Sequence, residues 1–369
     1  MLIGIGTIIV SIVIIGALFM NLSPQFGGKI SQKQEEEYAR SRNYKKGKFI
    51  NLGNINMSMS AKDMLKAIVG MIKAPSNTSP KSPIAIEQID STEIANYASD
   101  TRFVWFGHSA FLLQMAGKNI LIDPMLSEVP APHPWLGSKR FSRKLPIAIE
   151  KIPQIDAIII SHDHYDHLDY ASIIALKDKT THFYVPLGLS SHLTTWGVKK
   201  EQITELDWWQ KVSFETLQFT CTPAQHFSGR GFADRDKTLW CSWVIQSPTE
   251  NIFFSGDSGY GSHFKEIGQR FGSFDFAMVE CGQYNELWSE IHMFPEETAQ
   301  VALDLNAKLI MPIHWGAFKL AQHAWTDPIE RVIKKANELN VALVSPRIGE
   351  EVVLSSAHTI QQDWWKQDE

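Results

Sequence analysis

Three histidines and two aspartates lie within the segment Ser161–His167, which reads Ser-His-Asp-His-Tyr-Asp-His. In an extended loop, residues two apart point to the same side, so His162 and His164 can bind one metal ion. Asp166 and His167 would turn toward a second ion. Packing these groups together is costly unless their charges are compensated, and a pair of divalent cations compensates them. Such donors suit zinc, and iron or manganese would also fit. A solvated histidine-rich turn is the alternative.

Further candidate ligands follow runs of residues that are typical of β-strands. Ile155–Ile160 leads into the histidine-rich segment, Gln218–Thr222 precedes His226, Asn251–Phe254 precedes Asp257, and Lys308–Ile313 precedes His314. Because strands in a packed sheet are rigid, side chains at their ends can converge on one point. Between these runs, Pro295 and Asp327-Pro328 mark the starts of two helices. This alternation predicts an α/β domain from Asp100 onward.

The composition is that of a chain with a full-sized core. Its 369 residues are 44% apolar and 20% charged, which permits one large domain or two to three smaller ones. The formal net charge of −5 is mild, and no basic block indicates a nucleic-acid groove, so no nucleic-acid partner is expected. Cys221, Cys241 and Cys281 are too scattered for a disulfide framework. They are expected to be buried thiols.

The N-terminal stretch from Leu2 to Met20 carries no charge, and the first charged residue is Lys29. A helix of about 20 apolar residues crosses the hydrocarbon core of a bilayer. A cleaved signal peptide is the alternative, but no basic residue precedes the stretch. Because the Lys and Arg residues near the stretch all follow it, the positive-inside rule places the rest of the chain in the cytoplasm. The sequence thus predicts a membrane protein with a single N-terminal span.

The metal-ligand pattern resembles that of the metallo-β-lactamase superfamily, whose H-x-H-x-D-H signature is matched by His162–His167. In that family a lone histidine, an aspartate and a final histidine follow in order. His226, Asp257 and His314 match them in the contexts TPAQH, FFSGDSGYG and MPIHWG. The resemblance implies a four-layer αββα sandwich over about residues 101–350. It also implies two zinc ions, one held by His162, His164 and His226, the other by Asp166, His167 and His314, with Asp257 as the bridge.

Within the superfamily, the chain is similar to the N-acyl phosphatidylethanolamine-hydrolysing phospholipase D family. The shared segments are GKFIN (47–51), WFGHSAFLL (105–113), SHDHYDHLDY (161–170), YVPLGL (184–189), ELDWW (205–209), SGDSGY (255–260), KEIGQRFG (265–272) and IHWGAFKLA (313–321). In that family a tyrosine inside the signature and a histidine after the bridging aspartate contact the substrate. By resemblance these are Tyr165 and His292, although Val279–Phe294 differs from the family's segment.

This second resemblance implies hydrolysis of N-acyl phosphatidylethanolamine, a membrane phospholipid, to N-acylethanolamine and phosphatidic acid. Asp166 and His292 are then the expected catalytic residues, and His292 stabilises phosphoryl charge or protonates the leaving group. A structural role for His292, and a packing role for Tyr165, are the alternatives. His108 is expected either near the site or in the core as a hydrogen-bonded histidine. Asp163 is expected to point away from the metals and to support the ligands without binding a metal itself.

Four regions are expected along the chain. They are a membrane anchor at 1–22, an extension and linker at 23–99, the metallo-β-lactamase-fold hydrolase domain at 100–350, and a C-terminal tail at 351–369. The pair Trp364-Trp365 in the tail is expected either to lie in a frayed terminus or to touch lipid. The sequence leaves open whether the chain forms a homodimer. Rival functions are a hydrolase of the same fold acting on a soluble ester, a lactone or a nucleic-acid phosphodiester, a di-iron redox protein, and a non-catalytic binding protein.

Overall fold

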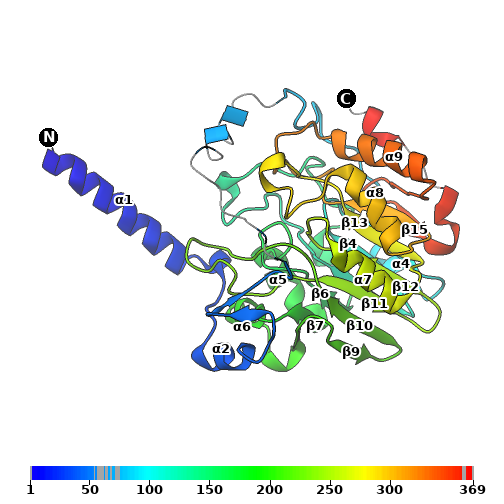
Figure 1. Ribbon diagram of the computed structural model, residues 1–369, viewed down its shortest axis with the longest axis horizontal. Helices are drawn as coiled ribbons and strands as arrows, with labels where there is room; N and C mark the ends of the chain where they lie inside the picture. Colours follow the sequence, from blue (N-terminus) through cyan, green and yellow to red (C-terminus); the bar gives the residue numbers. More distant parts are fainter. Residues whose placement is uncertain are drawn as a thin grey trace.

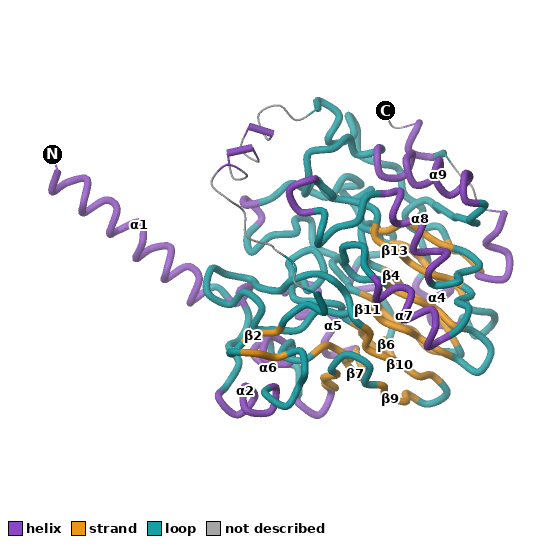
Figure 2. The backbone as a smooth tube through the Cα atoms, in the orientation of Figure 1, coloured by secondary structure: helices purple, strands orange, loops and turns teal. Residues whose placement is uncertain are grey.

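The computed structural model describes residues 2–53, 55, 62, 65–66, 69–70, 75–359 and 363–367. Two mixed β-sheets make up its centre, one of seven strands in the order β15-β3-β4-β5-β6-β7-β8 and one of six in the order β14-β13-β12-β11-β10-β9 (Figure 1). In each sheet one half is antiparallel and the other half is parallel. Extensive loops fill the part of the molecule between these sheets and α1 (Figure 2).

The strands of the seven-stranded sheet are β3 (Arg102–Trp105), β4 (Phe111–Met115), β5 (Lys118–Ile122), β6 (Ile155–Ile159), β7 (Thr180–Pro186), β8 (Ile203–Leu206) and β15 (Glu351–Val353). Those of the six-stranded sheet are β9 (Lys211–Phe214), β10 (Leu217–Thr222), β11 (Ser242–Gln246), β12 (Asn251–Phe254), β13 (Phe276–Glu280) and β14 (Ile310–Ile313). A short hairpin precedes them, formed by β1 (Tyr44–Lys45) and β2 (Lys48–Phe49). The α-helices are α1 (Leu2–Leu22), α2 (Gln32–Tyr38), α4 (Ser91–Asn96), α5 (Tyr170–Leu176), α6 (Ser190–Thr195), α7 (Ser262–Phe271), α8 (Pro295–Asp304) and α9 (Asp327–Leu339).

Alternation of apolar side chains along the strands produces four layers. Val104, Leu112 and Leu121 point to a cluster that they share with α4, α5 and α6, so these helices cover the outer face of the seven-stranded sheet. Their neighbours point inward, and Phe103 stacks on Phe276 of the other sheet with ring centroids 4.7 Å apart. Apolar residues of α7, α8 and α9 join the large core on the outside of the six-stranded sheet. The expected αββα sandwich is confirmed.

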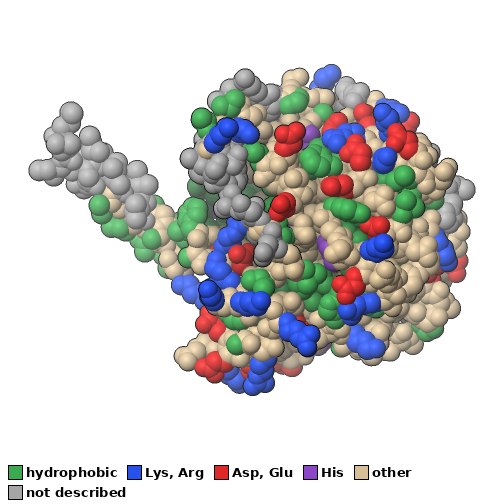
Figure 3. Space-filling view, in the orientation of Figure 1, with side chains coloured by type: hydrophobic (Ala, Val, Ile, Leu, Met, Phe, Trp, Pro, Cys, Tyr) green, Lys and Arg blue, Asp and Glu red, His purple; other side chains and the backbone are tan. Residues whose placement is uncertain are grey.

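The helices between the strands begin where their start signals predict. Pro295 occupies the first turn of α8, and Asp327 and Pro328 begin α9. The left-handed conformation of Asn340, with φ of 56°, ends α9. On the face shown in Figure 3, Lys and Arg side chains are interspersed with Asp and Glu, as the mild net charge implies.

Residues before the first long strand pack against the sandwich. The Trp196 indole donates a hydrogen bond to the Pro24 carbonyl at 2.7 Å, and the Tyr38 hydroxyl donates one to Glu205 at 2.9 Å. The Asn51 side chain donates to the His226 carbonyl at 2.7 Å, which brings the N-terminal segment to a candidate ligand. The predicted domain limits at 23–99, 100–350 and 351–369 stay predictions.

The prediction of a membrane-spanning helix at 1–22 is wrong. Residues Leu2–Leu22 form α1, which projects from the sandwich (Figure 1), but among the described residues no helix is sufficiently long and apolar to cross a bilayer. A crossing takes about 20 apolar residues. Towards its C-terminal end α1 carries the polar Asn21, whose side chain donates a hydrogen bond to the Ala17 carbonyl at 2.8 Å, and Phe19 packs edge-on against Phe26. The expected membrane localisation and cytoplasmic orientation rested on this span and are withdrawn with it.

Candidate metal centre

The histidine-rich segment follows β6 and is held by a buried aspartate that comes directly after the neighbouring strand β5. Asp123 accepts hydrogen bonds from the Ser161 amide at 2.7 Å and from the Ser161 hydroxyl at 2.5 Å. Gly256 permits the approach of the loop that carries Asp257, because a Cβ there would lie 2.7 Å from the Ser161 Cβ. Its φ of 57° is also one that glycine adopts without strain. Two loops from different sheets therefore meet at Ser161.

Four of the predicted ligands form a first group in which one donor atom of each lies within 4.8 Å of the others: His162, His164, His226 and Asp257. His164 Nδ1 is 3.0 Å from His162 Nε2 and 3.2 Å from His226 Nε2. The Asp257 Oδ2 atom lies 3.8 Å from the Nε2 atoms of both His162 and His226. These distances leave room for one shared cation between the donor atoms.

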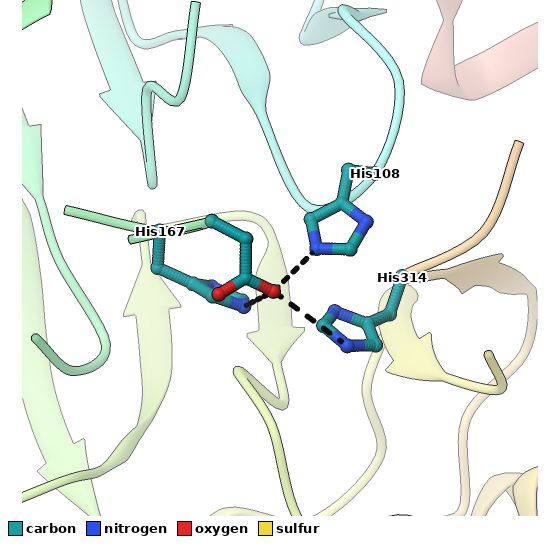
Figure 4. A group of neighbouring side chains, drawn as sticks. His108, His167 and His314 are labelled. Atoms are coloured by element: carbon teal, nitrogen blue, oxygen red, sulfur yellow. Dashed lines mark hydrogen bonds and ion pairs between the residues drawn. The ribbon is translucent and has the colours of Figure 1, made fainter. Parts of the chain in front are cut away.

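The other three predicted ligands form a second group that includes one further histidine: Asp166, His167, His314 and His108. Figure 4 shows the rings of His108, His167 and His314 turned toward one carboxylate, that of Asp166. Asp166 Oδ2 lies 2.8 Å from His108 Nε2, 3.6 Å from His167 Nε2 and 3.9 Å from His314 Nε2. His108 therefore lies beside the site, and it is also a buried, hydrogen-bonded histidine, so the two descriptions that the sequence left open both hold.

Asp257 lies between the two groups, where the bridging residue is expected. Its Oδ1 atom is 3.1 Å from His167 Nε2 and 3.1 Å from His314 Nδ1, while its Oδ2 atom faces the first group. Thus one carboxylate contacts side chains of both groups. The structure brings all seven predicted ligands together, although they span positions 162 to 314 of the chain.

The chemistry of this donor set fits a pair of cations. The Oδ1 atom of Asp257 and the Nε2 atom of His167 are buried without a hydrogen bond among the described residues, and such atoms are costly unless a partner satisfies them. Burial lowers the pKa of His162, His226 and His314 well below its usual value, so their rings are neutral and can donate a lone pair. Burial also raises the pKa of Asp257 to about 7, a shift that a neighbouring cation reverses.

Three carboxylates support the site without belonging to the predicted ligands. Asp123 contacts His167 Nδ1 at 2.7 Å, and Glu280 forms a short hydrogen bond with His292 Nδ1. Asp163 points away from the metal groups, as expected, and accepts hydrogen bonds from the Gly229 amide and the Thr238 hydroxyl, each at 2.8 Å. Sequence reasoning missed Asp123 and Glu280. The one available signal for both is their place at the end of a strand.

A cavity of about 510 Å³ lies over the two groups. His292 lines it together with the predicted ligands His164, Asp166, Asp257 and His314. One wall is formed by the loop that contains the 3-10 helix Glu286–Trp288. Tyr165 is not among the lining residues, and its hydroxyl donates a hydrogen bond to the Arg230 carbonyl at 2.6 Å. The Arg230 guanidinium lies 4.1 Å above the Tyr165 ring. The expected contact of Tyr165 with substrate stays a prediction.

Two packed mixed sheets with clustered histidines and aspartates at their loop ends define a metal-dependent hydrolase of the metallo-β-lactamase fold. The chain belongs to this superfamily, since residues 118–315 match the family model described as the Beta-lactamase superfamily domain. The family resemblance stated from the ligand motif is thus confirmed.

Relatives and solved structures agree with this assignment. An uncharacterized protein of Mycobacterium tuberculosis is 37% identical over 89% of this chain and 88% of its own length. A mitochondrial N-acyl-phosphatidylethanolamine-hydrolyzing phospholipase D of Saccharomyces cerevisiae is 34% identical over 68% of this chain but only 54% of its own length. The crystal structure of isothiocyanate hydrolase from Delia radicum gut bacteria has a TM-score of 0.54 at 24% identity and covers 68% of this chain and 98% of that chain. The last comparison shows the fold alone.

Proposed function

We propose that this protein is a dinuclear zinc hydrolase that cleaves N-acyl phosphatidylethanolamine at the phosphodiester bond, releasing N-acylethanolamine and phosphatidic acid. The observation that carries the proposal is the position of Asp257, whose two oxygens face two separate groups of ligands. The substrate class is supported by the similarity to the yeast enzyme and to a Caenorhabditis elegans N-acyl-phosphatidylethanolamine-hydrolyzing phospholipase D, which is 32% identical over 58% of this chain.

The two groups divide the proposed ligands between two ions, with Asp257 shared. His162, His164 and His226 would hold the first ion, and Asp166, His167 and His314 the second. A zinc pair supplies hydroxide at neutral pH and positive charge against the phosphoryl oxygens. The part of Asp166 in catalysis is to hold its ion, and His108 Nε2 orients the carboxylate through the 2.8 Å contact.

His292 is the proposed acid of the reaction. Its ring lies 5.1 Å from the His226 ring and 5.3 Å from the His314 ring, measured between centroids, so it faces both ligand groups. Its Nδ1 atom is bound to Glu280, which leaves Nε2 for the substrate. With both ring nitrogens protonated, Nδ1 donates to Glu280, and Nε2 donates a hydrogen bond to a phosphoryl oxygen or transfers its proton to the leaving oxygen.

The cavity wall offers both apolar and charged contacts to a phospholipid. Phe227, Leu287, Trp288 and Leu320 line it beside the metal groups, and these side chains exclude water around an acyl chain. Arg235 lies at the same cavity, with its guanidinium 4.4 Å from the centre of the Phe227 ring. A guanidinium there favours an anionic substrate such as a phosphodiester.

The test is hydrolysis by the purified full chain of three substrates, which are vesicles containing N-acyl phosphatidylethanolamine, bis(p-nitrophenyl) phosphate and a simple lactone. We expect mass spectrometry to find N-acylethanolamine and phosphatidic acid in equal amounts. His162→Ala should abolish their formation, whereas His182→Ala should not, because His182 binds Thr204 on β8 away from the cavity. Turnover of the lactone or the generic diester without lipid cleavage would instead favour a hydrolase of the same fold that acts on soluble substrates.

A further inference from the structure

A buried glutamate at the end of β13 contacts the proposed acid. Glu280 is 0% exposed, and its Oε1 atom forms a short hydrogen bond with His292 Nδ1. Its Oε2 atom accepts a hydrogen bond from the Ser258 amide at 2.7 Å. The backbone is held as well, because the Glu280 amide donates to the Ser255 hydroxyl at 2.9 Å and its carbonyl accepts from the Thr298 hydroxyl at 2.6 Å. Both carboxylate oxygens, the amide and the carbonyl of Glu280 thus each have a hydrogen-bond partner.

Packing alone does not explain a carboxylate at this position. Every residue of β13 from Phe276 to Glu280 is buried, and a carboxylate costs free energy in such surroundings that an apolar side chain would not. The strand also pairs Glu280 with Ile313, the residue before His314. The rigid strand β13 therefore holds Glu280 next to the residue that precedes His314, where its side chain contacts His292.

His292 depends on this contact for its orientation. It follows the 3-10 helix Glu286–Trp288 on a loop, where its amide donates a hydrogen bond to the Trp288 carbonyl at 3.2 Å. Among the described residues, the hydrogen bond to Glu280 is the one that its imidazole makes to a side chain. A histidine ring can turn about its side-chain bonds unless one nitrogen is held, and holding Nδ1 determines where Nε2 points.

We propose that Glu280 is the positioning residue for His292, and that it holds the ring through Nδ1 with Nε2 turned into the cavity over the two metal groups. The proposal rests on the proposed hydrolase function and assigns Glu280 a part in it. The pairing is the arrangement by which a buried carboxylate orients a histidine in other hydrolases. The alternative is that Glu280 only anchors the loop 281–292.

The first experiment is a double-mutant cycle between Glu280→Gln and His292→Ala. The Ser258 amide requires an oxygen, so the glutamine amide nitrogen would face Nδ1, and the oxygen that holds the ring in the wild type is lost. We expect Glu280→Gln to lower kcat about 10- to 100-fold while KM changes less than about 3-fold. In the His292→Ala background the same substitution should change kcat by less than about 2-fold. Equal effects of Glu280→Gln in both backgrounds would overturn the proposal.

The matched control is Asp304→Asn, which removes a carboxylate that binds the Tyr260 hydroxyl at 2.7 Å on α8. It should keep wild-type kcat, as a substitution outside the site does. Metal content of each variant is measured in parallel. Wild-type kcat in Glu280→Gln would also contradict the proposal.

The second experiment does not depend on turnover or on the folding of the Glu280 variant. NMR of protein labelled with ¹⁵N-histidine should find a strongly downfield Nδ1 proton in the wild type that His292→Ala removes, because a proton in a short bond to a carboxylate is deshielded. Absence of this resonance, or its persistence in His292→Ala, would overturn the positioning. If the wild type hydrolyses none of the three substrates, the proposed function is wrong, and the resonance still decides whether Glu280 holds the ring.

Discussion

Replacing Asp123 by asparagine should weaken metal binding although Asp123 is not a ligand. The aspartate is fully buried, and its Oδ2 atom lies 2.7 Å from His167 Nδ1 and 2.5 Å from the Ser161 hydroxyl, while Oδ1 accepts from the Ser161 amide. Asparagine has one oxygen, which the Ser161 amide requires, so its NH₂ group would face His167 Nδ1. Nδ1 must then accept a hydrogen bond, and the proton of the neutral ring moves to Nε2.

That tautomer blocks coordination, because Nε2 is the atom of His167 that faces Asp166 and Asp257 at 3.6 and 3.1 Å. Loss of an orienting partner of a ligand typically costs 10- to 100-fold in metal affinity, which is about 1.4–2.7 kcal/mol. The lost charge-assisted hydrogen bond should also lower the free energy of unfolding of the metal-free protein by about 1.5–3 kcal/mol.

The assay is a competition titration of the metal-free protein with zinc and a chelator of known affinity, together with urea unfolding. The matched control is Asp156→Asn, since Asp156 accepts from the Asn119 amide at 2.9 Å on the same sheet but does not contact a ligand. It should keep wild-type affinity for zinc. An Asp123→Asn protein that unfolds normally and binds zinc as tightly as the wild type would refute the reasoning.

Three further predictions concern metal removal, pH and the N-terminal segment. Chelation should lower stability by about 2.7 kcal/mol relative to protein with free zinc at 100 times its dissociation constant, and zinc should restore it; equal melting temperatures with and without metal would contradict this. Burial lowers the pKa of His263 from 6.5 to about 3, so its stabilising contribution is complete above pH 6.5 and is lost as the pH falls toward 3. The melting temperature of His263→Gln should accordingly vary less with pH between 6.5 and 4 than that of the wild type. An identical pH dependence of the two proteins would contradict the lowered pKa of His263. Arg230 donates hydrogen bonds to the carbonyls of Gln25 and Leu168 at 2.7 and 2.8 Å, so Arg230→Lys should lower the free energy of unfolding in urea by about 2–4 kcal/mol, and a loss under about 0.5 kcal/mol would be inconsistent with these contacts.

The seven predicted ligands could be chosen from the sequence because they lie in segments that follow runs with the composition of β-strands. Ile155–Ile159 and Asn251–Phe254 are continuous apolar runs, and the turn residues that follow them carry the donors. The sheets hold these strand ends in place, so the strand pattern together with the family motif was sufficient to predict the meeting point. His108 was harder to place, because its position beside Asp166 depends on a turn with φ of 56° that joins its carbonyl to the His314 amide.

Contacts between distant residues that lack a motif could not be predicted. Glu280 and His292 belong to no recognised motif, and the register of β13 with β14 brings the glutamate to the site. Trp364 and Trp365 were expected at a frayed end, but both are 1% exposed and pack on Trp315 at 5.4 and 5.7 Å between ring centroids. Composition also favoured a membrane span at the N-terminus, which the described helices do not support.

The most direct test of the metal centre is the metal content of the purified full chain, measured by inductively coupled plasma mass spectrometry alongside hydrolysis in the same sample. We predict two transition-metal ions per chain, loss of both ions and of hydrolysis after chelation, and recovery of both with added zinc. A preparation that hydrolyses its substrate with no bound metal, and keeps its full rate after chelation, would contradict the assignment of His162, Asp257 and His314 as ligands.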